Sequence, residues 1–239
     1  MQDNEQDNER QEIKLRCAVH QPNYLPWSGF FHKMASCDVL IILDNVQYSR
    51  RSFCNRTQVK SPSGALWLTL PIVKGPVEQE INQTRLFEPS KHLSRNFETL
   101  RHLYARAPYF SLLESELRLI YHQPWEFLLP FNLNLIRILA NILEITTPII
   151  LASNLGKPPA DKNQRIIFLC QQLGADTYLS GIGAKAYNDP QSFITAGLTL
   201  EYQSFQPPVY SQGKGDFISG LSIIDLIAYA GPKSRQLLT

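Results

Sequence analysis

The apolar residues of the chain fall into short runs of strand length, separated by segments with helical spacing. Residues 15–20 (LRCAVH) and 39–44 (VLIILD) are two such runs, and the apolar side chains of the segment 27–38 between them share one side of a predicted helix. A strand, a helix and a strand within about 30 residues form the βαβ pattern of a parallel sheet. Three later segments also have strand character: residues 148–153, 175–180 and 198–205.

The middle of the chain has a different pattern. Residues 56–72 predict a hairpin around the turn sequence SPSG, and from about residue 90 to 146 the apolar positions recur at helical spacing. Two further helices are predicted at 163–174 and 222–231, with Gly174 and Gly231 as their stops. We therefore predict an α/β fold, a Rossmann-like parallel sheet with a mostly helical insertion at about residues 90–146.

A single α/β domain over residues 14–239 is expected, because a chain of 239 residues with 44% hydrophobic content can bury one large core. The polar and acidic residues 1–13 predict a disordered tail and do not resemble a signal peptide. No run approaches the ~18 apolar residues that span a membrane. The four cysteines include no CxxC pair, which favours a reducing cytoplasm and argues against a metal site.

The net charge of +2 is too small to indicate a nucleic-acid partner. A small-molecule ligand is the better expectation. Three polar loops follow predicted strands, starting at His20, at Asp44 and at Ser180. Since the carboxyl ends of parallel strands meet at one edge of a sheet, where ligands bind, we expect these loops to form one site.

Each loop also has a structural interpretation. His20 is compatible with a core histidine that bonds a backbone carbonyl, and Asp44 with a turn cap or a partner of Arg51. The glycines of SGIGAK (180–185) expose backbone N–H groups near a lysine, but the spacing is neither that of a P-loop nor GxGxxG. Cys54 has only arginines nearby to support a reactive thiol, so a buried, unreactive cysteine is the better interpretation.

Several motifs, taken in order, resemble the WbqC-like proteins. They are HQPNYLPWSGFFHKM, DVLIILDNVQYSRRSFCNR, WLTLP, YLSGIGAKAY and LSIIDLIAYAGP, and the resemblance extends from Leu15 to the C-terminus. Such proteins are typically encoded in bacterial gene clusters for O-antigen and other surface polysaccharides. The resemblance implies a transferase that attaches an amino acid such as glycine, or an acyl group, to an amino sugar, with enzymes of the polysaccharide pathway as partners.

The matched motifs and the three loops together give the candidate site. His20 and Asp44 are the expected catalytic residues. The expected substrate-binding residues are Gln21, Asn23, Tyr24, Trp27, Lys33, Gln47, Tyr48, Arg51, Asn55, Arg56, Ser180, Gly181, Lys185 and Tyr187. Two positions depart from the family pattern, since Asn45 stands where an aspartate is common and Cys54 where a glutamine is usual. These departures argue against a catalytic acid at 45 and a nucleophile at 54.

The resemblance suggests specific roles. His20 is expected to act as general base, with Asp44 fixing its tautomer. Arg51 and Arg56 would hold a diphosphate or carboxylate, and Tyr24 and Trp27 would stack on a sugar or base. ATP or a nucleotide-linked sugar is the candidate substrate.

Two alternatives remain open. One is a non-catalytic module that binds or delivers a nucleotide sugar or an amino acid. The other is nucleotidyl transfer, suggested by a fainter similarity to nucleotidylyltransferases. In this chain, however, Trp27 and Phe30 occupy the places of the two histidines of their PxHxGH motif.

Overall fold

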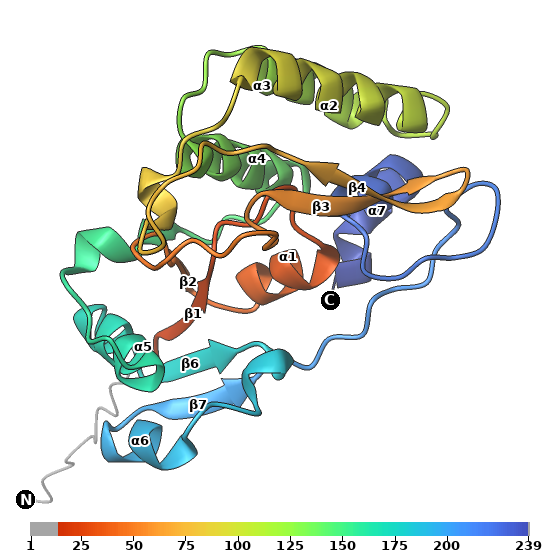
Figure 1. Ribbon diagram of the computed structural model, residues 1–239. Coiled ribbons are helices and arrows are strands. Elements are labelled where there is room, and N and C mark those ends of the chain that lie inside the picture. Colours follow the sequence, from red (N-terminus) through yellow and green to blue (C-terminus); the bar gives the residue numbers. More distant parts are fainter. Residues whose placement is uncertain (1–13, 239) are drawn as a thin grey trace, which may run out of the picture.

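The computed structural model of the protein describes residues 14–238 and contains a five-stranded parallel sheet (Figure 1). The strand order is β5-β2-β1-β6-β7, and every neighbouring pair in this sheet is parallel. In chain order this is 3-2-1-4-5, the order of doubly wound Rossmann sheets. The strands are β1 (Arg16–His20), β2 (Val39–Ile42), β5 (Ile149–Leu151), β6 (Thr177–Ser180) and β7 (Thr199–Tyr202).

Alternating side chains of the strands bury both faces of the sheet. Ala18 and Leu40 face a core shared with α1 (Ser28–Ala35), α4 (Leu128–Ile142) and α7 (Ile223–Ala230). Cys17, Val19 and Ile41 face a second core built with α5 (Lys162–Gln172) and α6 (Pro190–Thr195). Because both faces are covered, β2 and the inner residues Cys17–Val19 of β1 are apolar without a break, as in the sequence runs that predicted them.

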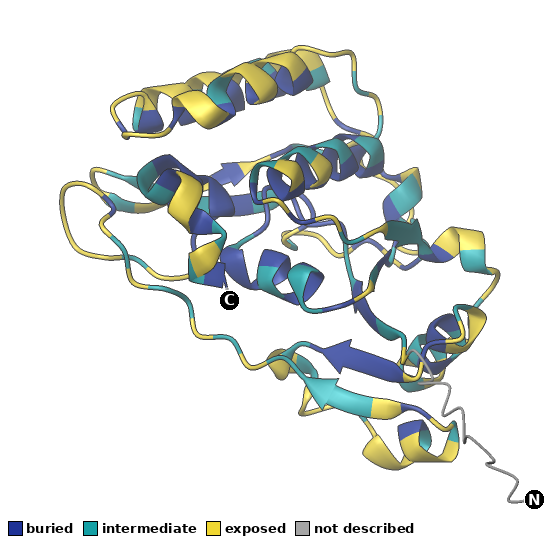
Figure 2. Ribbon diagram, turned by 180° about the vertical axis from the view of Figure 1, so that it is seen from behind, coloured by how far each residue is buried: buried dark blue, intermediate teal, exposed yellow. Residues whose placement is uncertain are grey.

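The connection from β2 to β5 contains a hairpin and three helices. The hairpin consists of β3 (Arg56–Ser61) and β4 (Gly64–Thr69), and Gly64 adopts a φ of +111° at its turn. α3 (Ser111–Tyr121) packs on α4, α7 and α2 (Pro89–Tyr104), so that α2 and α3 form an outer layer. The outward sides of these two helices are largely exposed, while the central strands are buried (Figure 2).

The structure confirms the α/β class, the five-stranded parallel sheet and the helical segment. Ser222 caps α7 by accepting from the Ile224 N–H, and Gly174 follows α5 with a φ of +63°. The helix α6 is absent from the sequence prediction. Short 3₁₀ segments complete the fold: Ile81–Gln83 (η1), Ala152–Leu155 (η2), Ile182–Ala184 (η3), Gly231–Ser234 (η4) and Gln236–Leu238 (η5).

Two sequence-based expectations concern the ends of the chain and membranes. The predicted disordered tail lies outside the described residues. Between residues 14 and 238 there is no helix with the length and apolar character needed to cross a membrane.

Candidate functional site

The candidate site lies where β1 and β6 end side by side. The chain leaves β1 through α1 toward β2, and it leaves β6 through α6 toward β7 on the opposite side of the sheet. This reversal makes the β1–β6 edge the topological switch point, the place where open parallel sheets bind ligands. His20 is the last residue of β1 and Ser180 the last of β6. Two of the three predicted loops therefore start at this point.

Lys33 of α1 extends toward this edge. Its side chain is buried, with only 5% exposed, and Nζ donates a hydrogen bond of 3.1 Å to the Val19 carbonyl oxygen. A Cβ atom at Gly181 would lie 3.8 Å from Nζ, so the ammonium group also borders the loop after β6. Burial lowers the pKa of Lys33 to about 8. Within residues 14–238 no carboxylate forms an ion pair with it.

His20 is partly exposed beside this lysine. Its Nδ1 lies 3.0 Å from the Gln21 carbonyl oxygen, and its ring meets Phe30 edge-on at 4.8 Å between centroids. Because a carbonyl can only accept, Nδ1 carries the hydrogen and Nε2 the lone pair. Burial, together with the charge of Lys33, lowers the pKa of His20 to about 3. The imidazole is therefore neutral at pH 7.

Asp44 does not orient His20, contrary to the expectation from the sequence. The carboxylate is 1% exposed, and its Oδ1 accepts from the Ser153 N–H at 2.9 Å. Its Oδ2 accepts a long bond of 3.4 Å from the Asn82 side-chain amide. Asp44 thus ties the end of β2 to η1 and η2, and the backbone carbonyl of Gln21 has the orienting role that was expected of Asp44.

The loop that begins at Asp44 packs against the loop after β1. The Tyr24 N–H donates to the Phe53 carbonyl at 2.8 Å, and the Cys54 thiol donates to Gln21 Oε1 at 3.5 Å. Asn132 of α4 joins both loops, because its Nδ2 donates to the carbonyls of Pro22 and Cys54 at 2.8 and 2.7 Å. Sequence reasoning missed Asn132, since its helix gives only an apolar pattern.

Six residues expected to bind substrate are buried: Asn23, Tyr24, Lys33, Tyr48, Asn55 and Ser180. Tyr24 has no exposed surface, and its hydroxyl bonds that of Tyr121 at 2.6 Å and accepts from Asn96. This position corrects the expectation that its ring stacks on a ligand. The Asn55 Nδ2 donates to the Leu70 carbonyl at 2.9 Å, and among the described residues its buried Oδ1 has no hydrogen-bond partner.

Trp27 stays at the rim of the switch point. Its ring lies over Gly29, where a Cβ atom would come within 2.2 Å of it, and meets Phe205 at 5.9 Å between centroids. Gln203, which follows β7, donates from Nε2 to the Gly29 carbonyl at 2.8 Å and lies 2.7 Å from His32 Nδ1. The end of β7 is thereby fixed to α1, an interaction that sequence analysis did not reveal.

The predicted residues of the second loop differ in exposure: Gln47 and Arg51 are exposed, Arg56 is half-buried, and Asp44, Tyr48 and Asn55 are buried. Arg56 stacks its guanidinium 4.2 Å from the centroid of the Trp67 ring, and Arg51 is exposed with a φ of +57°. Gln47 is exposed and donates to the Val77 carbonyl at 2.7 Å. Tyr48 is buried, and this burial raises its pKa to about 12.

Among the predicted residues of the third loop, Ser180 is buried, whereas Lys185 and Tyr187 are exposed. Ser180 is buried and accepts from the Asn188 side-chain amide at 3.0 Å. Lys185 is exposed, with Nζ 5.9 Å from the centroid of the Tyr202 ring, and Tyr187 is 60% exposed. Gly181, next to Lys33, is therefore the part of this loop nearest to the switch point.

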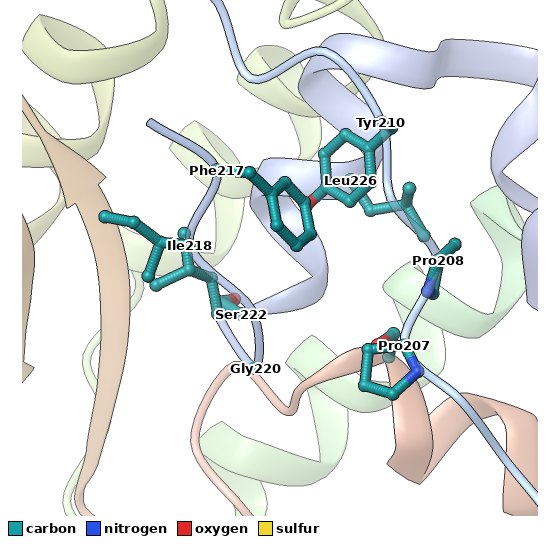
Figure 3. Close-up of a pocket in the computed structure, with 10 residues that line it drawn as sticks. Pro207, Pro208, Tyr210, Phe217, Ile218, Gly220, Ser222 and Leu226 are labelled. Carbon is teal, nitrogen blue, oxygen red and sulfur yellow. The ribbon is translucent and has the colours of Figure 1, made fainter. Parts of the chain in front are cut away.

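A recess of about 10 Å³ lies elsewhere, between α7 and the segment 207–222 (Figure 3). It has room for a single water molecule. Tyr210, Phe217 and Leu226 are among its lining residues, and none of the predicted site residues lines it. The recess is therefore separate from the candidate site.

The sequence comparisons identify the family. The model of the WbqC-like protein family matches residues 21–237, which contain the three loops apart from His20, the residue at which the first loop starts. This chain belongs to the WbqC-like protein family. The uncharacterized protein Rv1507c of Mycobacterium tuberculosis is 31% identical over 229 residues, 93% of this chain and 97% of that protein. No solved structure gave a significant match.

Proposed function

We propose that this WbqC-like protein transfers an aminoacyl group such as glycyl, or another acyl group, to the amine of an amino sugar in bacterial surface-polysaccharide synthesis. In this proposal a nucleotide-linked sugar binds with a phosphate at the switch point. The observation that carries it is the buried ammonium group of Lys33, which no carboxylate of residues 14–238 neutralises. Buried charges are normally paired, so an anionic ligand is the fitting partner.

The reaction forms an amide. The sugar amine attacks the carbonyl carbon of an activated acyl donor, the new C–N bond forms, and the bond to the donor's leaving group breaks. The nitrogen then loses a proton, for which His20 Nε2 is the acceptor. A pKa of about 3 makes the free imidazole a weak base, but the charge of Lys33 is one cause of that low pKa. A phosphate at Lys33 cancels this charge and raises the basicity of His20.

The proposal is tested with purified protein, a nucleotide-linked amino sugar, glycine and ATP, followed by mass spectrometry of the sugar. An acylated sugar supports the transferase. Binding without turnover supports instead the module that binds or delivers its ligand, and a nucleotidylated product with pyrophosphate release supports nucleotidyl transfer. Isothermal titration with pyrophosphate tests the anion site directly. Equal affinity of wild type and Lys33→Met would overturn it, and Lys157→Met, at an exposed loop lysine, is the matched control.

A further inference from the structure

An exposed aromatic pair lies next to the candidate site, with one ring on the hairpin and the other in the loop just before it. Phe53 is 57% exposed and Trp67 of β4 is 39% exposed, and their ring centroids lie 6.0 Å apart at an angle of 42°. Arg56 of β3 covers part of the Trp67 ring at 4.2 Å. We call these three side chains the hairpin platform. Exposed aromatic rings grouped in this way are typical of binding surfaces.

The register of the hairpin explains why these groups share a face. Arg56 pairs with Thr69, and Gln58 pairs with Trp67. Since side chains alternate along a strand, these four residues lie on one face of the hairpin, while Val59 and Leu68 lie on the other and are buried. The face with Arg56 and Trp67 therefore combines an aromatic ring, a guanidinium, an amide and a hydroxyl.

The charge of this region is one-sided. Between Asp44 and Glu78 the sequence has no carboxylate, but it has five cationic side chains: Arg50, Arg51, Arg56, Lys60 and Lys74. Arg56 forms no ion pair with any carboxylate of residues 14–238, and its buried Nε has no hydrogen-bond partner in that range. A buried donor without an acceptor costs free energy, and carboxylates and phosphates are the acceptors that a guanidinium group binds best.

We infer that the hairpin platform is a subsite for a pyranose ring that carries a carboxylate or phosphate. The C–H face of a pyranose packs on an aromatic ring, while its hydroxyls bond side chains such as Gln58. Because the two rings are tilted by 42°, they do not form the pair of parallel rings between which a flat nucleobase stacks. This inference rests on the proposed function, since it places the sugar ring of the same ligand class.

The platform is joined to the switch point by short contacts. Phe53 bonds the loop after β1 through its carbonyl, which accepts from the Tyr24 N–H. Its neighbour Cys54 donates to Gln21, the residue that follows His20. Both the hairpin platform and the switch point therefore contact the loop after β1. A single ligand can place its charged group at the switch point and its sugar ring on the hairpin platform.

The experiment measures binding by isothermal titration calorimetry with glucuronate, glucose and AMP. Glucuronate should bind with a Kd on the order of millimolar, and more tightly than glucose. Trp67→Ala should weaken glucuronate binding at least tenfold, and Trp67→Phe should retain most of it because a ring remains. Arg56→Gln should remove the preference for glucuronate over glucose. Leu66→Ala, an exposed position on the opposite face of the same strand, should change nothing.

Unchanged binding in Trp67→Ala would overturn the subsite, as would equal binding of glucose and glucuronate by the wild type. Tighter AMP binding that depends on Trp67 would also overturn it, in favour of a nucleobase. Failure of the proposed function gives a different result. In that case Lys33→Met binds pyrophosphate as tightly as the wild type does, while glucuronate binding still depends on Trp67 and Arg56. Circular dichroism of each variant separates a lost site from a lost fold.

Discussion

The ammonium nitrogen of Lys33 lies 3.1 Å from the carbonyl oxygen of Val19, one residue before the end of β1. This carbonyl is a neutral partner for a buried cation. The fall of the lysine pKa from 10.5 to about 8 corresponds to about 3 kcal/mol of destabilisation when the group is charged. Such a position reduces the stability of the free protein, and in the proposed function it supplies the cation that binds an anionic ligand.

Replacing Lys33 should separate stability from binding. Lys33→Met keeps the length of the side chain and removes the charge, so the free energy of unfolding at pH 7 should rise by about 1–3 kcal/mol. Pyrophosphate affinity should fall at least tenfold, as titration calorimetry will show. Lys157→Met should change neither quantity. A destabilised Lys33→Met protein with intact pyrophosphate binding would show that the lysine supports the fold alone.

Titration of Lys33 should change the stability of the protein and its affinity for anions in opposite directions as the pH rises. The folded protein has the lower lysine pKa, so between about pH 8 and 10.5 the unfolded chain binds more protons, and the contribution of Lys33 to stability rises with pH. Anion affinity should instead fall as pH increases through about 8, because Lys33 loses its charge. Denaturant unfolding and pyrophosphate titration at several pH values, compared with Lys33→Met, measure both trends. Identical pH profiles in the two proteins would contradict this assignment.

Asp44 and His20 should behave as independent residues. Asp44→Ala removes the acceptor for the Ser153 N–H and should destabilise the fold by about 1–3 kcal/mol. His20→Ala should reduce transfer by about two orders of magnitude. In a double-mutant cycle, the changes in unfolding free energy caused by Asp44→Ala and His20→Ala should add within about 0.5 kcal/mol. A larger coupling energy would indicate a pairing that is not formed in the structure.

Replacing Gly29 by alanine should destabilise the protein unless the Trp27 side chain is also made smaller. A Cβ atom at Gly29 would lie 2.2 Å from the indole ring, so Gly29→Ala must displace that ring from its place beside Phe205. We expect a loss of about 1–3 kcal/mol in unfolding free energy. Trp27→Leu in the Gly29→Ala background should recover part of the loss, measured by thermal and denaturant unfolding. If the second substitution makes the protein still less stable, the steric explanation fails.

The fold was predictable where the signal is local. The apolar runs at β1 and β2 reflect burial on both faces, and the spacing at α2 reflects a single buried stripe. α6 has only six residues, too few to show a helical period. The edge strand β5 is shorter still, with three residues inside the predicted segment 148–153.

The site was predictable as a location but not as a set of contacts. The rule that loops meet at the carboxyl edge places His20 and Gly181 together, and the structure agrees. The partner of Tyr24 is Tyr121, 97 residues away, and that of Asp44 is Ser153, 109 residues away. No local pattern reveals such pairs, so a buried structural tyrosine and a buried structural aspartate resemble ligand-binding residues in the sequence.

Asn132 links the helical insertion to two loops of the candidate site. One amide on α4 holds the backbone oxygens of Pro22 and Cys54, and these atoms belong to the two loops that border the ligand edge. A small shift of α4 therefore moves both loops together. Relatives can in this way diverge in ligand preference through repacking of a remote helix, with every ligand-contacting side chain retained. A comparison of motif residues alone does not detect such a shift of α4.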